Sequence, residues 1–142
     1  MTDIAIKECK SYRETEILEL YKSVGWSAYY DHPKALKAAF EGSLCILGAY
    51  AGGELVGLCR VVGDGSTVVF LQDILVKPTY QRQGIGRRLI AAVLEKYRHV
   101  RQLYLMTDDL PATVGFYKAV GFTPVEEIHC RAFTRLRYSE LP

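Results

Sequence analysis

Glycine and arginine are concentrated in one short segment, which reads Gln-Arg-Gln-Gly-Ile-Gly-Arg-Arg from position 81 to position 88. An amphipathic pattern follows it, so we expect a helix to begin here. A helix start exposes unpaired backbone N–H groups and carries partial positive charge, and both attract anions. Glycines at 84 and 86 would let the backbone approach a ligand closely, and a bound anion would offset the unfavourable placement of three arginines at a positive helix end. The segment therefore predicts a phosphate site.

The same segment excludes two common phosphate motifs. A P-loop needs Lys and then Ser or Thr after its last glycine, and Gly86-Arg87-Arg88 stands here instead. A dinucleotide-binding GxGxxG fails because Leu89 occupies the place of the third glycine, and because the preceding strand is not the first of a βαβ unit. On local chemistry alone, the alternative is a glycine-rich turn whose arginines face water.

The surrounding patterns indicate which elements must position this segment. Alternating or apolar runs predict strands at residues 4–9, 44–50, 55–62, 67–76, 102–107, 122–125 and 128–137, and helical spacing predicts helices at 11–24, 33–42, 84–97 and 111–120. We expect a capping box at Ser11 and Glu14, an aromatic loop at 26–30 and a C-terminal hairpin. The strands around Leu75 and Tyr104 should be parallel neighbours, with a cleft opening just after Val76. The fold class is then α/β, with a mixed, mostly antiparallel sheet of about seven strands and helices on both faces.

Composition agrees with a single globular domain over residues 1–142. The chain has 49% hydrophobic and 24% charged residues and a net charge of +2, which gives no footprint for nucleic acid or for an anionic membrane. It shows neither a bilayer-spanning apolar run nor a secretion signal, so we expect a cytoplasmic protein. Its four cysteines have no metal-ligand or CxxC spacing, which favours reduced, buried thiols and no metal site.

Two blocks of the sequence resemble a known family. Asp73-Ile74-Leu75-Val76-Lys77-Pro78, followed by Gln81-x-x-Gly84-x-Gly86, resembles motif A of the GNAT superfamily of acyl-CoA-dependent N-acetyltransferases. Phe116-Tyr117-Lys118-Ala119-Val120-Gly121-Phe122 resembles that family's FYxxxGF signature, at the expected distance downstream. The order of the expected elements is similar to that of the family over nearly the whole chain.

The resemblance implies acetyl-CoA as the cofactor, with its pyrophosphate on the backbone N–H groups of residues 83–87. It also implies that the strand holding Ile74, Leu75 and Val76 bulges and splays from its parallel neighbour, and that the pantetheine arm lies in the gap. The residues that it assigns to coenzyme A are Ile74, Leu75, Val76, Gln81, Arg82, Gln83, Gly84, Ile85, Gly86, Arg87, Phe116 and Tyr117.

The resemblance further implies two catalytic groups for acetyl transfer from acetyl-CoA to a primary amine, by direct attack on the thioester. A backbone N–H near Leu75 would polarise the thioester carbonyl. Tyr117 would act as the general acid for the leaving thiolate. The sequence also departs from the family, because Leu110 and Thr113 stand where relatives often have asparagine and alanine.

The general base is left open. Many relatives have glutamate where this chain has Gln72, which can form hydrogen bonds but cannot usefully accept a proton. The substitutes considered are Asp73, Glu126, Glu127, His129 and His32, or else an amine that arrives already neutral. The rival interpretation is a non-catalytic acyl-CoA sensor or interaction module on the same fold.

The acceptor is expected at the least family-like parts of the chain. Trp26, Tyr29 and Tyr30, together with Gln72 and Asp73, are the candidate substrate-binding residues. The three aromatic residues would line a pocket for an amine or, equally, cap the core. We expect a small-molecule or peptide amine as the partner and no nucleic acid or membrane, and because related folds often dimerise, the resemblance also admits a homodimer.

Overall fold

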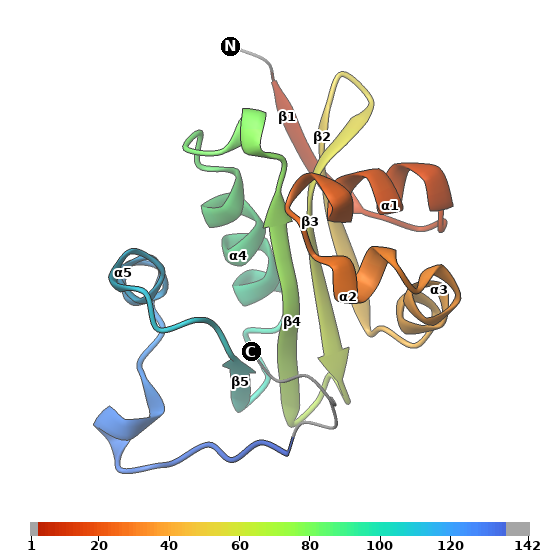
Figure 1. Cartoon of the computed structure of the whole chain (residues 1–142). Helices are drawn as coiled ribbons and strands as arrows, with labels where there is room; N and C mark the ends of the chain where they lie inside the picture. The colour runs from red at the N-terminus through yellow and green to blue at the C-terminus, as the bar shows by residue number, and fades with distance from the viewer. Residues whose placement is uncertain (1–2, 136–142) are drawn as a thin grey trace. The chain divides into compact units, whose positions relative to one another are not determined.

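The fold was analysed in a computed structural model, which describes residues 3–135 (Figure 1). Contacts divide the chain into two compact units, residues 1–106 and residues 107–142, and each unit is described by itself. No helix among the described residues is long and apolar enough to span a membrane.

The first unit is built on a five-stranded sheet in the order β1-β2-β3-β4-β5. The strands are β1 (Ile4–Glu8), β2 (Cys45–Ala51), β3 (Glu54–Gly63), β4 (Val68–Val76) and β5 (Gln102–Leu105). The first four strands pair antiparallel, and β5 pairs parallel to β4. Gly52 and Gly53 have positive φ angles of 56° and 89°, which a tight turn between β2 and β3 requires and which glycine adopts without strain.

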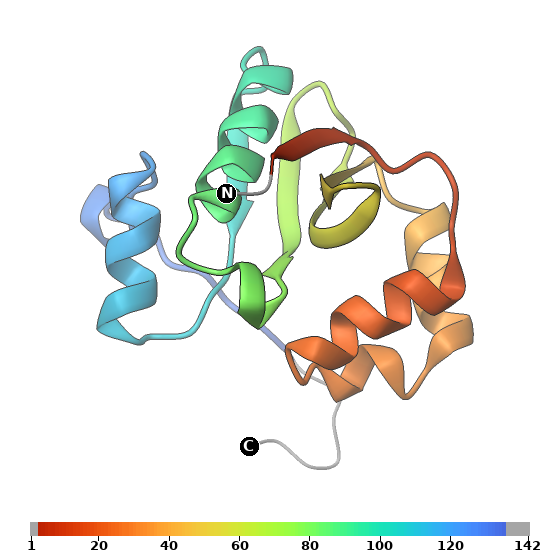
Figure 2. The ribbon, with the colours of Figure 1, turned by 90° about the horizontal axis from the view of Figure 1, so that it is seen from above.

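Helices cover both faces of this sheet (Figures 1 and 2). On one face lie α1 (Glu14–Ser23), α2 (Ser27–Tyr30) and α3 (Pro33–Glu41), and on the other lies α4 (Ile85–Lys96). The side chains that α1 and α3 bury meet those of β3 and β4 in one core cluster: Ile17, Leu20, Tyr21, Leu36, Phe40, Leu55, Leu58 and Leu75. The predicted α/β architecture with helices on both faces is confirmed.

Two irregularities of β4 coincide. The pairing with β3 shifts register between Arg60, which lies opposite Asp73, and Val61, which lies opposite Leu71, so Gln72 is the extra residue of a β-bulge. The parallel pairing with β5 ends at Leu71, which lies opposite Leu105. Residues 72–76 thus continue along β3 without a parallel partner among the described residues, as the expected bulge and splay require.

The second unit contains α5 (Pro111–Ala119) and a short 3₁₀ helix (Val125–Ile128). The prediction of strands at 122–125 and 128–137 is wrong for the residues that the structure describes, because none of these residues after position 105 is in a strand. Positions 136 and 137 lie outside the described residues. Pro124 has no N–H for a ladder and starts the 3₁₀ helix, and His129 adopts a left-handed φ of 60°. The sheet formed by residues 3–135 therefore has five strands and not about seven.

The expectations for the N-terminal helices need two corrections. The capping box is absent: Arg13 is the N-cap of α1, and no side chain caps this helix. Glu14 then occupies the first helical position, too early for its side chain to reach back to an N-cap amide, although its charge still favours the positive helix end. Part of the aromatic segment, expected as a loop, forms the single helical turn α2.

Candidate functional site

The start of α4 has the backbone conformation of an open anion site. Gly84 is its N-cap in the left-handed region, with φ of 80°, and no side chain among the described residues caps it. A Cβ added at Gly84 would meet no atom within 4 Å, so the space in front of the backbone is open. The first amides of α4 lack intrahelical partners by geometry. These features fit a bound phosphate or pyrophosphate.

The polar side chains of this segment divide into anchoring and exposed groups. Arg88 donates from an Nη atom to the carbonyl of Ile4 at 2.9 Å, which ties α4 to β1 and commits that guanidinium elsewhere. Gln81 Nε2 donates to the Val76 carbonyl at 3.0 Å and links the segment to the end of β4. Arg82 and Arg87 are exposed, so they are the arginines free to approach an anion.

The unpaired part of β4 presents backbone groups along one edge. The Lys77 amide donates to the Val56 carbonyl at 2.8 Å, so the pair Lys77–Val56 is a hydrogen-bonded pair of the antiparallel ladder. Such pairs alternate, and the Leu75 amide therefore also points toward β3, whereas the amides of Ile74 and Val76 point away from it. An extended ligand arm could pair with this edge much as another strand would.

A buried polar network lies directly beside the bulge. Asp73 is 2% exposed, and its Oδ2 accepts from Arg60 Nε at 2.7 Å and from the Tyr21 hydroxyl at 2.9 Å. Its Oδ1 accepts from the Tyr29 hydroxyl at 2.7 Å. The guanidinium of Arg60 also donates to Ser43 Oγ at 3.2 Å. The carboxylate is thus held by side chains from α1, α2 and β3.

This network occupies both carboxylate oxygens of Asp73, so the group is poorly placed to take a proton from an amine. Burial, followed by the nearby carboxylate, raises the pKa of Tyr21 far above its ordinary value, and burial is also the main cause that raises the pKa of Tyr29. Both hydroxyls therefore keep their protons and act as donors to Asp73.

The aromatic residues proposed to contact the acceptor are packed against the core. Tyr21 and Tyr29 have ring centroids 5.0 Å apart, Trp26 lies 6.1 Å from Tyr29, and Trp26, Tyr29 and Tyr30 are all partly buried against the core cluster. Tyr29 alone of these three joins the polar network.

The sequence reading missed Tyr21, Ser43 and Arg60. Arg60 could have been found, because a single cation inside the apolar run of β3 requires a buried partner. Tyr21 and Ser43 gave no such signal.

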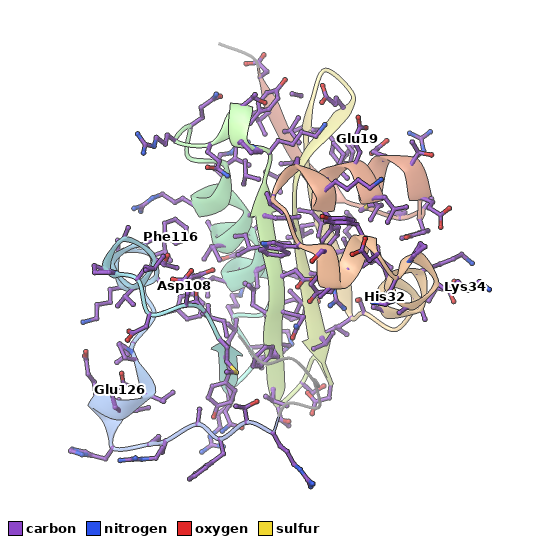
Figure 3. The ribbon with its side chains drawn as sticks, viewed as in Figure 1. Glu19, His32, Lys34, Asp108, Phe116 and Glu126 are labelled. Atoms are coloured by element: carbon purple, nitrogen blue, oxygen red, sulfur yellow. The ribbon has the colours of Figure 1, made fainter. Side chains whose placement is uncertain are left out.

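The FYxxxGF block lies in the second unit. The ring of Tyr117 packs edge to face against Phe116 and Phe122, with ring centroids 5.1 Å and 5.9 Å apart, respectively. Asp108 Oδ1 accepts from the Leu110 amide at 3.1 Å just before α5, so Asp108 helps to build this helix start (Figure 3).

The other candidate bases are divided between the two units of the chain. Glu127 forms an ion pair with Lys118 at 3.1 Å, and Glu126 and His129 belong to the same unit. His32 is the N-cap residue of α3 in the first unit (Figure 3). Of these four residues, only His32 belongs to the first unit.

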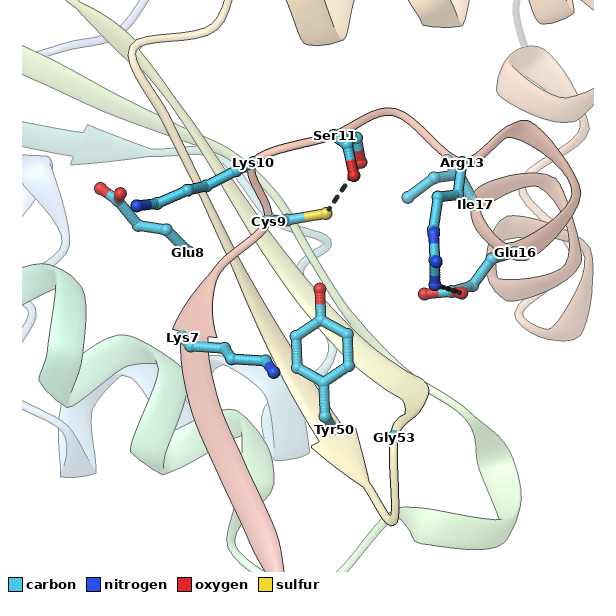
Figure 4. A pocket seen from close by; sticks show the side chains of 10 residues that line it. All are labelled: Lys7, Glu8, Cys9, Lys10, Ser11, Arg13, Glu16, Ile17, Tyr50 and Gly53. Atoms are coloured by element: carbon cyan, nitrogen blue, oxygen red, sulfur yellow. Dashed lines mark hydrogen bonds and ion pairs between the residues drawn. The ribbon is translucent and has the colours of Figure 1, made fainter.

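None of the candidate residues lines either of two pockets among the described residues of the first unit. The larger, of about 620 Å³, lies between β1, β2 and α1 and is lined by Lys7, Cys9, Tyr50 and their neighbours (Figure 4). The smaller, of about 420 Å³, is lined by residues of α1 together with Glu54, Leu55 and Lys77.

Comparison with known proteins decides the family. The model of the Acetyltransferase (GNAT) family matches residues 11–122. The chain belongs to this family. A GNAT family acetyltransferase from Streptococcus pneumoniae TIGR4 is 36% identical, with a TM-score of 0.83, and the match covers 95% of this chain and 98% of that one. The fold is also similar to aminoglycoside N-acetyltransferase AAC(6')-Iy in complex with a bisubstrate analogue, at 23% identity and a TM-score of 0.74 over 96% of this chain and 100% of that one.

The curated relatives carry related names. An uncharacterised N-acetyltransferase of Prochlorococcus marinus is 30% identical over 115 residues, which are 76% of this GNAT chain and 61% of the relative. The N-alpha-acetyltransferase RimI of Mycobacterium tuberculosis is 40% identical over 83 residues, which are 56% of this chain and 52% of the relative. The chain thus spans about half to three fifths of the length of these two relatives. The family indicated by the two sequence blocks is confirmed.

Proposed function

We propose that this GNAT chain transfers an acetyl group from acetyl-CoA to a primary amine. The observation that carries the proposal is the coincidence on one strand of two features: β4 loses its parallel partner at the bulge, and the segment after β4 leads into the uncapped, open start of α4. Together they offer the unpaired edge of β4 to the extended pantetheine arm of coenzyme A, and the N-terminus of α4 to its phosphates.

The residues proposed to hold coenzyme A are mostly backbone groups. The amides of residues 83–87 would bind the pyrophosphate, with Arg82 and Arg87 beside them. The edge at Ile74 and Val76 would bind the pantetheine arm. Since the Leu75 amide points toward β3, the donor that polarises the thioester carbonyl would be one of the neighbouring amides, of Ile74 or Val76.

Acetyl-CoA would supply an activated acetyl thioester. The amine nitrogen forms the new N–C bond as the C–S bond breaks, and the electron pair of that bond stays with sulfur. The amine loses one proton and the sulfur gains one, which leaves an N-acetyl amide and the free thiol. Tyr117 is proposed as the donor of the sulfur's proton, and Phe116 as its packing partner at the coenzyme.

Two relatives bear on the acceptor. The aminoglycoside N-acetyltransferase takes its name from a small amine substrate, and RimI is named for an α-amino group. Both names support an amine acceptor for this chain, either a small molecule or a peptide. The cytoplasmic location, the single domain and the homodimer stay predictions from the sequence.

Thermal unfolding with and without acetyl-CoA tests the cofactor, with CoA, ATP and NAD as controls. Selective binding to the native state should raise the free energy of unfolding by about 2.7 kcal/mol at a hundredfold excess over Kd. Equal or absent shifts with acetyl-CoA at saturating concentration would refute the coenzyme site.

Thiol release across an amine panel then tests transfer, and Tyr117→Phe should lower kcat by about 10²–10⁴-fold with little change in melting temperature. Binding of acetyl-CoA without thiol release above background would favour the sensor interpretation, which Gln72 in the base position motivates. Unchanged turnover of Tyr117→Phe would remove the role of Tyr117 alone.

A further inference from the structure

The hydroxyl of Tyr29 contacts two consecutive residues of β4. It donates to Asp73 Oδ1 at 2.7 Å, and it accepts from Gln72 Nε2 at 3.3 Å. Consecutive residues of a regular strand point to opposite faces of the sheet, so one hydroxyl would not normally reach both. The bulge at Gln72 makes the double contact possible.

The donors and acceptors that each side chain carries fix the direction of the hydrogen bonds between Asp73, Tyr29 and Gln72. The carboxylate of Asp73, paired with Arg60, can only accept, so the single hydroxyl proton of Tyr29 goes to it. Toward Gln72, the oxygen of Tyr29 can then only accept, so Gln72 must present its NH₂ group to Tyr29. The orientation of the Gln72 amide follows from its partners.

The other end of that amide is available. Gln72 is exposed, and its Oε1 makes no hydrogen bond with any of the residues that the structure describes. Gln72 is also the first residue of β4 beyond the parallel pairing with β5, where the edge proposed for the coenzyme begins. A carbonyl oxygen of fixed orientation, Gln72 Oε1, thus lies where β4 loses its parallel pairing with β5.

We propose that Gln72 is the positioning residue for the acceptor, with its Oε1 accepting one N–H of a neutral primary amine, and that the site therefore takes amines that are largely uncharged near neutral pH, such as α-amino groups, in preference to lysine ε-amino groups. This inference rests on the proposed function. An amide orients the nitrogen but cannot remove its proton, so the ammonium proton is lost to bulk water before the amine binds.

Within the described part of the first unit, the titratable and charged groups linked to Gln72 by hydrogen bonds do not replace the missing base. They are Tyr29 from α2, Tyr21 from α1, Arg60 from β3 and Asp73 from β4 itself. The two tyrosines retain their protons, Arg60 stays charged, and Asp73 is held by all three. The acidity of the amine itself should then set the pH dependence.

The kinetic test compares a short peptide with a free α-amino group and an Nα-blocked lysine. For each, kcat/KM should rise tenfold per pH unit and level off at the pKa of that amine. At pH 7.5 the α-amine should be preferred by about two orders of magnitude, the ratio of the neutral fractions for ordinary pKa values near 7.8 and 10.4. A break at the same pH for both amines would overturn the inference.

Two substitutions test whether Gln72 positions the amine or only supports the fold. Gln72→Ala and Tyr29→Phe should each raise KM for the amine about tenfold while KM for acetyl-CoA stays unchanged. The matched control is Gln102→Ala, because Gln102 is another glutamine whose Nε2 donates to a tyrosine hydroxyl, that of Tyr104 at 2.7 Å, without an aspartate behind it. A Gln72→Ala enzyme with unaltered amine KM would overturn the inference even if Tyr29→Phe failed to fold.

A binding measurement without acetyl-CoA gives an independent readout. The side-chain NH₂ resonances of Gln72, identified by their loss in Gln72→Ala, should shift when the peptide amine is added at pH 8.5, where an α-amino group is largely uncharged. No shift at that pH would overturn the inference. A protein that fails to bind acetyl-CoA and yet shows the amine-dependent shift would contradict the proposed function and would leave only the binding of an amine at Gln72.

Discussion

At the scale of single residues, two tyrosines that pack in the same core, Tyr21 and Tyr12, differ in whether their hydroxyl groups form hydrogen bonds. The hydroxyl of Tyr21 is fully buried and donates to the Asp73 carboxylate. The hydroxyl of Tyr12 is also buried, but it has no hydrogen-bond partner among the described residues, and burial raises its pKa. A buried polar group without a partner costs free energy, whereas a hydrogen bond to a charged group stabilises.

The two Tyr→Phe substitutions should therefore differ in sign. Tyr12→Phe should raise the free energy of unfolding by about 1 kcal/mol, and Tyr21→Phe should lower it by about 1.5–3 kcal/mol. Urea unfolding of the two variants beside the parent protein measures both. A loss of stability in Tyr12→Phe would show that a water or another group satisfies that hydroxyl.

The residues of the site were only partly readable from the sequence. Motif spacing located the open helix start at Gly84 and the strand of Ile74 and Val76, because backbone conformation leaves a signature in glycine and aliphatic positions. The partners of Asp73 come from three separate elements, and nothing local to Tyr21 or Tyr29 records that they converge on one carboxylate. The direction of the Leu75 amide depends on a ladder register that a sequence does not show.

At the scale of elements, the left-handed turn before α4 and the middle of α5 offer a matched pair of glycines. A Cβ would meet nothing within 4 Å at Gly84 or at Gly115, but only Gly84 has a positive φ. Gly84→Ala should lower the free energy of unfolding by about 1–2 kcal/mol, because the left-handed conformation strains any residue with a Cβ.

Gly115→Ala is the control for that prediction. It should raise stability by about 0.5–1 kcal/mol, since alanine favours a helix interior. Chemical denaturation measures both variants, and equal effects at the two sites would mean that backbone conformation does not govern them.

The turn between β3 and β4 should be sensitive to acid. Asp64 accepts from the Thr67 hydroxyl at 2.6 Å and from the amides of Ser66, Thr67 and Val68, and these bonds hold its pKa far below its ordinary value. A depressed pKa contributes stability that is present above the ordinary pKa and is lost as the pH falls through the folded value. The loss should begin below about pH 4.

Asp64→Asn removes that titration and keeps a side-chain acceptor. Its stability deficit relative to the parent protein should be largest near pH 6 and should shrink as the pH falls below about 4. Asp31→Asn is the control, because Asp31 is exposed and its side chain makes no hydrogen bond among the described residues. A constant deficit across the pH range would refute the role of the carboxylate charge.

The elements of the first unit and the helix α5 of the second could largely be predicted from the sequence, whereas the segment after α5 could not. The strands β2 and β3 are nearly continuous apolar runs that the sheet buries on both faces, and burial alternates along β4. Residues 122–137 also contain spaced apolar side chains, but Pro124 interrupts any ladder and a 3₁₀ helix follows it. In that segment, the missing backbone N–H of Pro124 thus outweighs the spacing of apolar residues.

At the scale of the whole chain, the four cysteines should report on unfolding. All are free thiols: Cys45 and Cys59 are buried, Cys9 is partly buried and Cys130 is exposed. Burial raises the pKa of Cys59 to about 12 and also raises that of Cys45, so neither forms the reactive thiolate at neutral pH.

Maleimide labelling followed by mass spectrometry tests this order. Cys130 should react first and Cys9 more slowly, while Cys45 and Cys59 should react only in denaturant. Rapid labelling of Cys59 under native conditions would show that the sheet opens far below its global unfolding free energy.

The consecutive order of the strands also bears on how the chain folds. The strands β2, β3 and β4 are joined by two tight turns, so their pairing closes only short loops and costs little chain entropy. The strand β5 can dock only after a crossover that includes all of α4, and its ladder joins just four residue pairs. The central meander should therefore form early and protect its amides longest from hydrogen exchange, and residues 68–71 of β4 should gain their parallel neighbour last.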